Sequence, residues 1–501
     1  MIAYSRHLAG TPFADLLRGL AQVGTHASIR GIALDSRGIG PGYLFLAVHG
    51  HDHHGLKHLA DAMKHGAVAV AYDPVGAEAF LPLPAGLPAV ALPELSQKAG
   101  LIAARFYADP TANQRVMAVT GTNGKTSVSL ITAQVLTETG QPCAVLGTVG
   151  FGAYGKLEPP THTTPDAVSM QAWLARFRDQ GLKRISMEAS SHALEQGRLA
   201  GVRVEVGVFT NLTRDHLDYH GSMEAYGAAK RRLFLMPGVK HAVINLDDEF
   251  GRTLPAAFPR GVSITGYSLE GRKSPVGKTL LGEKLELNSG GFTFDVAGDF
   301  GQGHVDSRLL GRFNAQNLLA VMGALMALDL DFDTALHALC RARTVPGRME
   351  CFGGGEGRPL VVVDYAHSPD ALEKALTAAR AHCRGKLWCV FGCGGERDRG
   401  KRPQMGAIAE RLADAVIVTD DNPRHEDGDA IVAEILAGMQ ARPAVQRDRA
   451  KAVAQAVQGA VPGDVVLVAG KGHETEQVIG DEELEYSDRA TVAVLTGGTL
   501  P

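Results

Sequence analysis

Arg115-Val-Met-Ala-Val-Thr-Gly-Thr-Asn-Gly-Lys-Thr126 is the stretch of sequence that decides the fold. Val116–Val119 is a short apolar run, which is typical of a buried parallel strand. Gly121–Gly124 predicts a sharp turn, and apolar residues at helical spacing predict a helix over Ser127–Thr139 that ends at Gly140. A strand, a glycine-rich loop and a helix in this order hold nucleotide phosphates, because glycines let backbone N–H groups approach the phosphate oxygens.

Two side chains of this stretch predict contacts with a nucleotide and its metal ion. Lys125 would neutralise the β- and γ-phosphates, and the Thr126 hydroxyl would ligate Mg²⁺. The strict P-loop pattern fails, since Val119 stands where its first glycine belongs. This departure argues against an ordinary P-loop GTPase or kinase. The remaining alternative, a glycine-rich turn with no ligand, is disfavoured by the Gly-Lys-Thr run in this context.

The composition of the whole chain is that of an ordinary globular protein. Its 501 residues predict about three domains. The net charge of −4 gives no polybasic surface for nucleic acid. No apolar run could span a bilayer and no signal peptide is evident, so we expect a soluble cytoplasmic protein without membrane insertion. The six cysteines form no paired CxxC sets, which favours reduced, buried thiols.

Residues 1–93 are expected to form a small α/β domain. Its Asp35-Ser36-Arg37 run ends a predicted strand with three polar groups, which could hold a ligand or simply form a turn. The run from His49 to His54 resembles a metal-binding tract, but its irregular spacing favours a solvated or ligand-contacting loop. The proline-rich segment Pro82–Pro93 is predicted to be a linker.

Residues 94–340 are expected to form a central domain around a P-loop-type ATPase sheet. A predicted strand, Arg184–Met187, ends in Glu188, where a neighbour of the phosphate loop would place a Mg²⁺ ligand or an acid that holds its water. The alternative is an N-cap for the next helix. Asn211–His216 forms a polar loop after the next strand, while Lys230, from chemistry alone, is an ordinary helix lysine.

Residues 341–501 repeat strand–helix units and predict a doubly wound, Rossmann-like sheet. Ligands of such sheets bind beyond the carboxyl ends of the strands. Four successive predicted strands end in polar runs, which is hard to explain as scattered surface. These runs are Asp364–His367, Gly394–Asp398, Asp421–Arg424 and Gly470–Glu474.

Five motifs together resemble one family of enzymes. They are Gly121-Thr-Asn-Gly-Lys-Thr126, Met187-Glu-Ala-Ser-Ser-His192, Asn211-Leu-Thr-Arg-Asp-His216, Asp364-Tyr-Ala-His367 and Gly470-Lys-Gly-His-Glu474. Taken together they are similar to the motifs of the Mur ligases, the ATP-dependent amide ligases that build the stem peptide of peptidoglycan. The resemblance covers nearly the whole chain and matches the order of the three domains.

The resemblance implies a reaction with ATP and Mg²⁺ as cofactors. Asp421-Asn-Pro-Arg424 is similar to the motif of members that add meso-diaminopimelate to UDP-N-acetylmuramoyl-L-alanyl-D-glutamate through an acyl phosphate. Lysine-adding members lack the arginine. Arg424 could pair bidentately with the distal carboxylate that lysine does not have, and an unpaired Arg424 would penalise lysine.

The resemblance also implies catalytic roles for Lys125, Glu188, His216 and Lys230. The implied metal ligands are Thr126, Glu188, His216 and Lys230, the last as a carbamate. That role of Lys230 rests on the resemblance alone.

The remaining implied site residues fall into three groups by ligand. The ATP group is Gly121, Thr122, Asn123, Gly124, Lys125, Thr126, Ser127, Asn317, Arg348, Asp364 and His367. The UDP-muramoyl-dipeptide group is Leu34, Ser36, His51, Asp52, His53, His162, Thr163, Thr164, Ser190, Gln196 and Arg198, with His162 standing where other members carry Asn. The diaminopimelate group is Arg397, Asp421, Asn422, Pro423, Arg424, Gly470 and Glu474.

Two kinds of alternative function stay open at this point. One is the same ligation with L-lysine, or a ligase similar to folylpolyglutamate synthetase. The other is a nucleotide-binding switch, which is disfavoured because the chain lacks an Asn-Lys-x-Asp guanine motif and carries a third domain with ligand-lined strand ends. The expected partners are small-molecule substrates and no nucleic acid, and the protein is expected to be a monomer.

Overall fold

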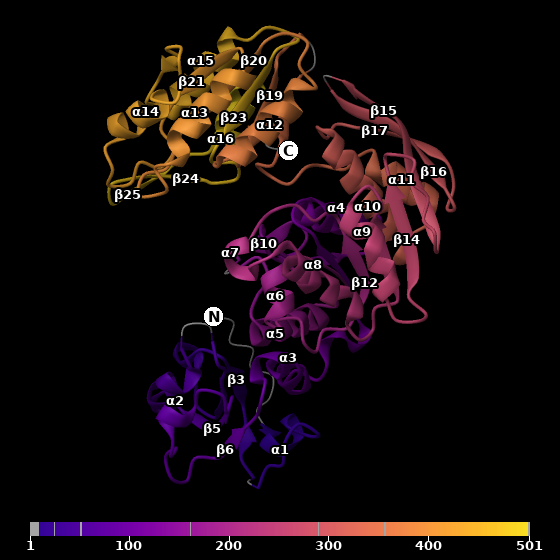
Figure 1. The fold of residues 1–501 in the computed structure, drawn as a ribbon, viewed down its shortest axis with the longest axis vertical. Helices are drawn as coiled ribbons and strands as arrows, with labels where there is room; N and C mark the ends of the chain where they lie inside the picture. The colour runs from indigo at the N-terminus through magenta and orange to yellow at the C-terminus, as the bar shows by residue number, and fades with distance from the viewer. Residues whose placement is uncertain are drawn as a thin grey trace. The chain divides into compact units, whose positions relative to one another are not determined.

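The structure is a computed structural model that describes residues 10–24, 26–50, 53–160, 162–288, 290–354 and 357–498, without the side chain of Asp218. The contacts divide the chain into two compact units. The first unit comprises residues 1–267, 273–279 and 323–331, and the second comprises residues 268–272, 280–322 and 332–501. Both have a mixed α/β fold, as the sequence predicted (Figure 1). The boundaries of the three predicted domains stay a prediction. In the described part of the chain no helix is long and apolar enough to cross a membrane.

The first sheet of the first unit has four parallel strands in the order β3-β4-β5-β6. The strands are β3 (Gly31–Ala33), β4 (Tyr43–Ala47), β5 (Ala67–Tyr72) and β6 (Ala89–Ala91). The nearby elements are β1 (Thr11–Pro12), β2 (Ser28–Ile29), α1 (Phe13–Leu16), α2 (Leu59–Lys64) and α3 (Leu95–Phe106).

Strand β6 lies inside the segment Pro82–Pro93, so the prediction that this segment is a linker was wrong for its last third. Val70 of β5 pairs with Ala89, and Tyr72 pairs with Ala91. Because β6 is an edge strand, prolines on both sides of it remove no ladder hydrogen bond from the sheet interior.

The second sheet of the first unit carries the phosphate loop. Up to β14, its strands follow the order β10-β9-β8-β11-β7-β12-β13-β14, and β7 runs parallel to both of its neighbours, β11 and β12. The strands are β7 (Arg115–Thr120), β8 (Cys143–Gly147), β9 (Gly150–Ala153), β10 (Lys156–Glu158), β11 (Arg184–Glu188), β12 (Val204–Phe209), β13 (His241–Asn245) and β14 (Ser263–Ser268). The helices are α4 (Lys125–Glu138), α5 (Ala167–Asp179), α6 (Ser191–Glu195), α7 (Leu217–His220), α8 (Met223–Arg231) and α9 (Glu249–Thr253).

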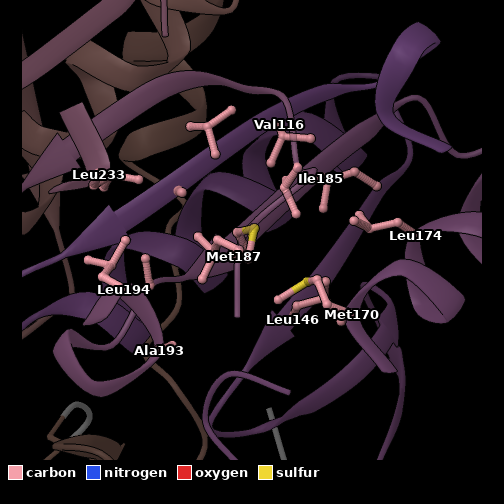
Figure 2. Close-up of a cluster of buried hydrophobic side chains, with 14 of the residues drawn as sticks. Val116, Leu146, Met170, Leu174, Ile185, Met187, Ala193, Leu194 and Leu233 are labelled. Carbon is pink, nitrogen blue, oxygen red and sulfur yellow. The ribbon is translucent and has the colours of Figure 1, made fainter. Parts of the chain in front are cut away.

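An apolar core fixes the strands on either side of the phosphate loop. Val116 of β7 and Ile185 and Met187 of β11 are buried with Met170 and Leu174 of α5, as Figure 2 shows. Continuous burial of strand residues is what a parallel sheet covered on both faces requires. The carboxyl ends of β7, β11 and β12 therefore meet at one rigid edge.

The second unit begins with an antiparallel meander and ends with a mostly parallel sheet. The meander is β15 (Lys278–Asn288), β16 (Gly291–Gly298) and β17 (Gly303–Ser307). The later sheet has the order β18-β19-β23-β20-β21-β22. Its strands are β18 (Glu350–Gly353), β19 (Leu360–Asp364), β20 (Leu387–Phe391), β21 (Ala415–Val418), β22 (Ala444–Val445) and β23 (Val465–Ala469), and β24 (Glu476–Ile479) and β25 (Glu482–Glu485) form a separate hairpin.

Helices cover both faces of this sheet. They are α12 (Pro369–Arg380), α13 (Lys401–Leu412), α14 (Gly428–Leu436), α15 (Arg449–Gly459) and α16 (Asp488–Leu495), while α10 (Arg312–Ala327) and α11 (Phe332–Leu339) precede them. Val362 packs in the cluster with α12 to α14, whereas Val361 and Val363 pack in the cluster with α15 and α16. This alternation confirms the predicted doubly wound sheet.

Candidate active site

The phosphate loop is held in a conformation that only glycine tolerates at its first position. Gly121 has φ +150°, and a Cβ added there would lie 1.9 Å from Oγ1 of Thr210. Gly124 has φ +85° and immediately precedes α4, so the backbone N–H groups at the start of this helix are exposed at the loop. The loop therefore has the geometry of an anion site at a helix N-terminus.

Two lysines converge on one carbonyl oxygen of this loop. Nζ of Lys125 donates to the carbonyl oxygen of Gly121 at 2.9 Å, and Nζ of Lys230 donates to the same atom at 2.7 Å. Lys230 is buried, and its Nζ lies 4.2 Å from the ring centre of Tyr226, one turn earlier on α8. Burial and then the charge of Lys125 lower the pKa of Lys230 to about 6, while Asp215 opposes this shift. Lys230 is therefore largely a neutral amine at neutral pH.

Glu188, at the carboxyl end of β11, forms a network with threonine hydroxyls. Its Oε2 accepts from Oγ1 of Thr126 at 3.0 Å, and its Oε1 accepts from the backbone N–H of Thr148 at 2.7 Å. Burial raises its pKa, against the charge of Lys125 and these hydrogen bonds. Mg²⁺ prefers oxygen ligands such as carboxylate and hydroxyl oxygens that lie side by side. Thr126 and Glu188 therefore fit the predicted metal ion.

The loop that follows β12 fastens the phosphate loop from the other side. The side chain of Asn211 accepts from the backbone N–H of Asn123 at 2.9 Å and donates to its carbonyl oxygen at 3.1 Å. Oγ1 of Thr210 donates to the same carbonyl oxygen at 2.6 Å. These contacts hold the loop in place before any nucleotide binds.

His216 lies near this site but is the most open of the predicted catalytic residues. Its side chain is 46% exposed, and its Nε2 lies 3.5 Å from Oδ2 of Asp215. Its ring packs edge to face against His192, with 4.9 Å between the ring centres. Among the described residues, no group of three or more His, Cys, Asp or Glu side chains is arranged to hold a metal ion. The fit for Mg²⁺ thus rests on Thr126 and Glu188, since Mg²⁺ commonly takes one or two carboxylates together with substrate phosphates.

A second polar cluster contains the residues predicted for the muramoyl dipeptide. Arg198 donates through Nε and Nη2 to Oε1 of Gln196, at 2.9 and 2.6 Å, and through Nη1 to the carbonyl oxygen of Thr164 at 3.0 Å. Oγ1 of Thr164 in turn donates to the carbonyl oxygen of Glu188 at 2.9 Å. Ser190 caps α6 and receives a hydrogen bond from Ala193. The structure joins this cluster to Glu188, whereas His162 is exposed.

The predicted residues of the N-terminal domain have mainly local contacts. Ser36 is buried at the start of a short 3₁₀ helix, and Leu34 packs against the core beside it. His53 is exposed, with its Nε2 3.3 Å from Nε2 of His58. His51 and Asp52 lie outside the described residues.

In the second unit, the residues predicted for ATP gather around Asp364. Its carboxylate accepts from the backbone N–H groups of Met349 at 2.8 Å and Ala366 at 2.9 Å, and burial raises its pKa. The Arg348 guanidinium lies 4.8 Å from the ring centre of Tyr365. His367 is exposed near the same ring, at 4.7 Å.

Asn317, which is also predicted to contact ATP, has a side-chain hydrogen bond within its own helix. It is buried on α10, where its Nδ2 donates to Oδ1 of Asn314 at 3.0 Å.

The residues predicted for diaminopimelate converge at the carboxyl ends of β21 and β23. Asp421 and Asn422 follow β21, and Gly470 and Glu474 follow β23. Nδ2 of Asn422 donates to Oε2 of Glu474 at 3.1 Å. A Cβ added at Gly470, where φ is +123°, would lie 2.6 Å from Oδ2 of Asp421, so only glycine allows this approach. Burial raises the pKa of Asp421, against the charges of Arg449 and Lys471.

Arg424 adopts a left-handed backbone, with φ +52°. Its backbone N–H donates to the carbonyl oxygen of Val478 in β24 at 3.1 Å, and its Nη1 donates to the carbonyl oxygen of Gly395 at 2.8 Å. Pro423 is buried against Gly395, while Arg397 is exposed on the same loop. A non-glycine residue in this conformation is uncommon and marks a backbone held by its surroundings.

Sequence reasoning missed residues that complete these networks. Thr148 follows β8 and could have been found by the rule that ligands gather at strand ends. Asn211 belongs to one of the five motifs but had no assigned role, and Thr210 immediately precedes that motif. Lys471 also lay in a quoted motif, yet nothing in the sequence indicates that its ammonium is completely buried.

Comparisons with known proteins cover most of the chain. The family model described as Mur ligase family, catalytic domain, matches residues 28–107. The Mur ligase middle domain matches residues 119–325, and the Mur ligase glutamate ligase domain matches residues 347–472.

Relatives of similar length also match the chain and include named ligases. The chain is 50% identical over 476 residues to UDP-N-acetylmuramoyl-L-alanyl-D-glutamate–2,6-diaminopimelate ligase of Alkalilimnicola ehrlichii, covering 94% of this chain and 95% of the relative. A solved structure of an enzyme with that name is 36% identical, with a TM-score of 0.76, and covers 97% of this chain and 99% of its own. Folylpolyglutamate synthase of Mycobacterium tuberculosis, complexed with ADP and AMPPCP, shares the fold at 18% identity and a TM-score of 0.57, covering 74% and 91%.

Proposed function

The chain belongs to the Mur ligase family, and we infer that it is the ligase that adds meso-2,6-diaminopimelate to UDP-N-acetylmuramoyl-L-alanyl-D-glutamate with ATP. The observation that carries this conclusion is the 50% identity to a ligase of that name over 94% of the chain. The product is an amide, and the reaction belongs to peptidoglycan synthesis. A folylpolyglutamate synthetase activity is not favoured, because that likeness extends to the fold alone.

The proposed reaction proceeds through an acyl phosphate. The terminal phosphate of ATP passes to the side-chain carboxylate of D-glutamate, and an amine of diaminopimelate attacks the activated carbonyl. The tetrahedral intermediate then collapses to the amide and inorganic phosphate, leaving ADP. Such a reaction needs chiefly positioning and neutralisation of charge from the protein.

We assign the triphosphate to the loop Gly121–Ser127. Its backbone N–H groups at the start of α4 would donate to the phosphate oxygens, and Lys125 would move from the carbonyl oxygen of Gly121 to a phosphate. The fastening of Asn123 by Asn211 supports a preformed loop. Asn317, Arg348, Asp364 and His367 are also proposed as ATP-binding residues.

Thr126 and Glu188 are the residues that would hold Mg²⁺. The ion would supply neutralisation of the phosphate charge. Lys230 is proposed to carry a carbamate, because a neutral amine adds CO₂ whereas an ammonium does not, and burial keeps this amine neutral. Addition of CO₂ to the neutral amine, with release of one proton, would give an anionic carbamate ligand near Lys125, whose charge would then stabilise it. His216 is proposed to serve the same metal sites.

The muramoyl dipeptide is proposed to contact both sheets of the first unit. Leu34, Ser36, His51, Asp52 and His53 would bind the uridine nucleotide. The dipeptide would contact His162, Thr163, Thr164, Ser190, Gln196 and Arg198. The hydrogen bonds from Arg198 to Gln196 and Thr164, and from Thr164 to Glu188, support a connected site in which the reacting carboxylate lies beside the phosphate loop.

Diaminopimelate is assigned to Arg397, Asp421, Asn422, Pro423, Arg424, Gly470 and Glu474. The guanidinium of Arg424 would pair with the distal carboxylate, which L-lysine does not carry. The left-handed backbone of Arg424 is held by its hydrogen bond to Val478. This supports a fixed direction for the Arg424 side chain. The cytoplasm is the proposed location, in keeping with the use of ATP and a UDP-linked sugar, and the proposed state is a monomer.

Mass spectrometry of the product tests this function directly. The purified protein is incubated with ATP, Mg²⁺, the UDP-muramoyl dipeptide and meso-diaminopimelate. We expect a UDP-linked product heavier than the dipeptide by one diaminopimelate minus one water, with one ADP formed per product. An ATPase that forms ADP without this product would contradict the proposed function.

A further inference from the structure

Lys471 is a completely buried lysine that the proposed function leaves without a role. It follows Gly470 at the carboxyl end of β23, and its side chain has 0% exposure. Its Nζ donates to Oδ1 of Asn422 at 2.8 Å and to Oε2 of Glu474 at 3.0 Å. Burying an ammonium costs free energy unless it is paired. These two acceptors therefore allow the Lys471 side chain to be buried.

The contacts of Lys471 fix the orientation of the Asn422 amide. Oδ1 of Asn422 accepts from two donors, Nζ of Lys471 and the backbone N–H of Val478 at 3.0 Å. Nδ2 donates to Oε2 of Glu474 at 3.1 Å. If the amide turned over, its NH₂ group would face an ammonium and an N–H, and its oxygen would face a carboxylate. Only one orientation is therefore compatible with the site.

This orientation of the Asn422 amide determines which hydrogen-bond donor and which acceptor the site can offer to a ligand. The acceptor oxygen of Asn422 is used within the protein, so the hydrogen-bonding capacity that remains is an N–H of Nδ2. Oε2 of Glu474 accepts from both Lys471 and Asn422. The Tyr365 side chain also hydrogen-bonds this carboxylate, and because each carboxylate oxygen has two lone pairs, Oε1 keeps acceptor capacity for a ligand. A donor beside an acceptor matches an amino acid, whose carboxylate accepts and whose ammonium donates.

We propose that Lys471 is a positioning residue for the amino-acid substrate, which holds Asn422 as a hydrogen-bond donor to a substrate carboxylate and Glu474 as an acceptor for a substrate ammonium. This inference rests on the proposed function, since it takes diaminopimelate as the ligand of these strand ends. It assigns Asn422 the role of donor, and it explains why a lysine is buried beneath the site.

The first test is the variant Lys471→Met, assayed for ligation with each substrate varied in turn. We expect the KM for meso-diaminopimelate to rise about tenfold to a hundredfold, the effect of losing one charge-assisted hydrogen bond or two. The KM values for ATP and for the UDP-muramoyl dipeptide should stay within about twofold of the parent. A merely structural lysine would instead lower the melting temperature and leave the KM for diaminopimelate unchanged, which would overturn the proposal.

The matched control is Lys451→Met in the same unit. Lys451 pairs with Asp448 at 3.0 Å, three residues apart, as Lys471 pairs with Glu474 three residues away at 3.0 Å. The side chain of Lys451 is 73% exposed, however, and lies outside the site. This variant should leave all three KM values unchanged. An equal rise of the diaminopimelate KM in both variants would overturn the assignment.

A second variant, Asn422→Asp, tests the donor role even if Lys471→Met does not fold. It keeps the side-chain shape and an acceptor for Lys471, but it removes the amide N–H. We expect the KM for meso-diaminopimelate to rise at least tenfold, and an unchanged KM would contradict the orientation argued above. If the parent protein forms no product with diaminopimelate, the proposed function fails. A parent that is active and variants with unchanged KM values would refute this inference alone.

Discussion

Replacing Lys230 by methionine should abolish ligation and, at the same time, stabilise the protein in a pH-dependent way. Lys230 is buried, and its pKa falls from 10.5 to about 6. Between these values the unfolded chain binds one proton more than the folded chain, so this lysine makes stability rise with pH by ~1.4 kcal/mol per pH unit. Methionine keeps a similar apolar length and carries no proton.

The magnitude follows from the pH interval chosen. From pH 7 to pH 9, both inside the window, the parent should gain ~2.7 kcal/mol from Lys230 that the variant does not gain. The variant is therefore more stable than the parent, and its advantage shrinks by that amount at the higher pH. All other titrating groups are common to the two proteins and cancel in the difference.

Urea unfolding of the first unit measures this difference. The chain has two tryptophans, Trp173 in the first unit and Trp388 in the second, so a Trp388→Phe background confines the fluorescence signal to the first unit. Buffers are kept free of CO₂ to prevent carbamate formation. Lys64→Met, on an exposed lysine at the end of α2, is the control and should change stability equally at both pH values. An advantage of Lys230→Met that does not depend on pH would refute the reasoning.

Three further substitutions have defined outcomes. Arg424→Lys should lower the preference for meso-diaminopimelate over L-lysine about tenfold to a hundredfold, as measured by the ratio of kcat/KM values, because an ammonium cannot pair bidentately; an unchanged ratio would place recognition elsewhere. Gly121→Ala should abolish ATP binding in calorimetry, because its Cβ would lie 1.9 Å from a hydroxyl of the neighbouring loop; retained affinity would show that the loop can yield. Arg449→Met should destabilise the second unit by about 3–5 kcal/mol in urea unfolding followed at Trp388, because it leaves Asp488 buried without its partner at 2.7 Å; a neutral effect would contradict this.

Much of the fold could be predicted because its signals are local. The apolar run before Gly121 became β7, and the strand ending in Glu188 became β11 beside it. The rule that ligands bind beyond strand ends put Asp421 and Gly470 in candidate ligand-binding runs, and the structure brings these two residues together. The prediction failed at Ala89–Ala91, because the prolines that flank it indicated a linker, whereas its pairing with β5 is a contact between distant parts of the sequence.

The parts of the site that could not be predicted depend on contacts between distant segments. Lys230 is an ordinary helix lysine in the sequence, and only packing against Tyr226 and the loop of Gly121 makes it a buried neutral amine. The left-handed backbone of Arg424 is likewise imposed by the hairpin that begins 52 residues later, counted from 424 to 476. Lys471 gains its importance from Asn422, which lies on a different strand end.

The most direct test of the central claim is phosphate release with ATP, Mg²⁺ and UDP-N-acetylmuramoyl-L-alanyl-D-glutamate, comparing meso-diaminopimelate with L-lysine. We predict turnover with diaminopimelate and almost none with lysine at the same concentration, since only diaminopimelate has a distal carboxylate for Arg424. Equal turnover with lysine would contradict the specificity, and no turnover with either amino acid would contradict the assigned reaction.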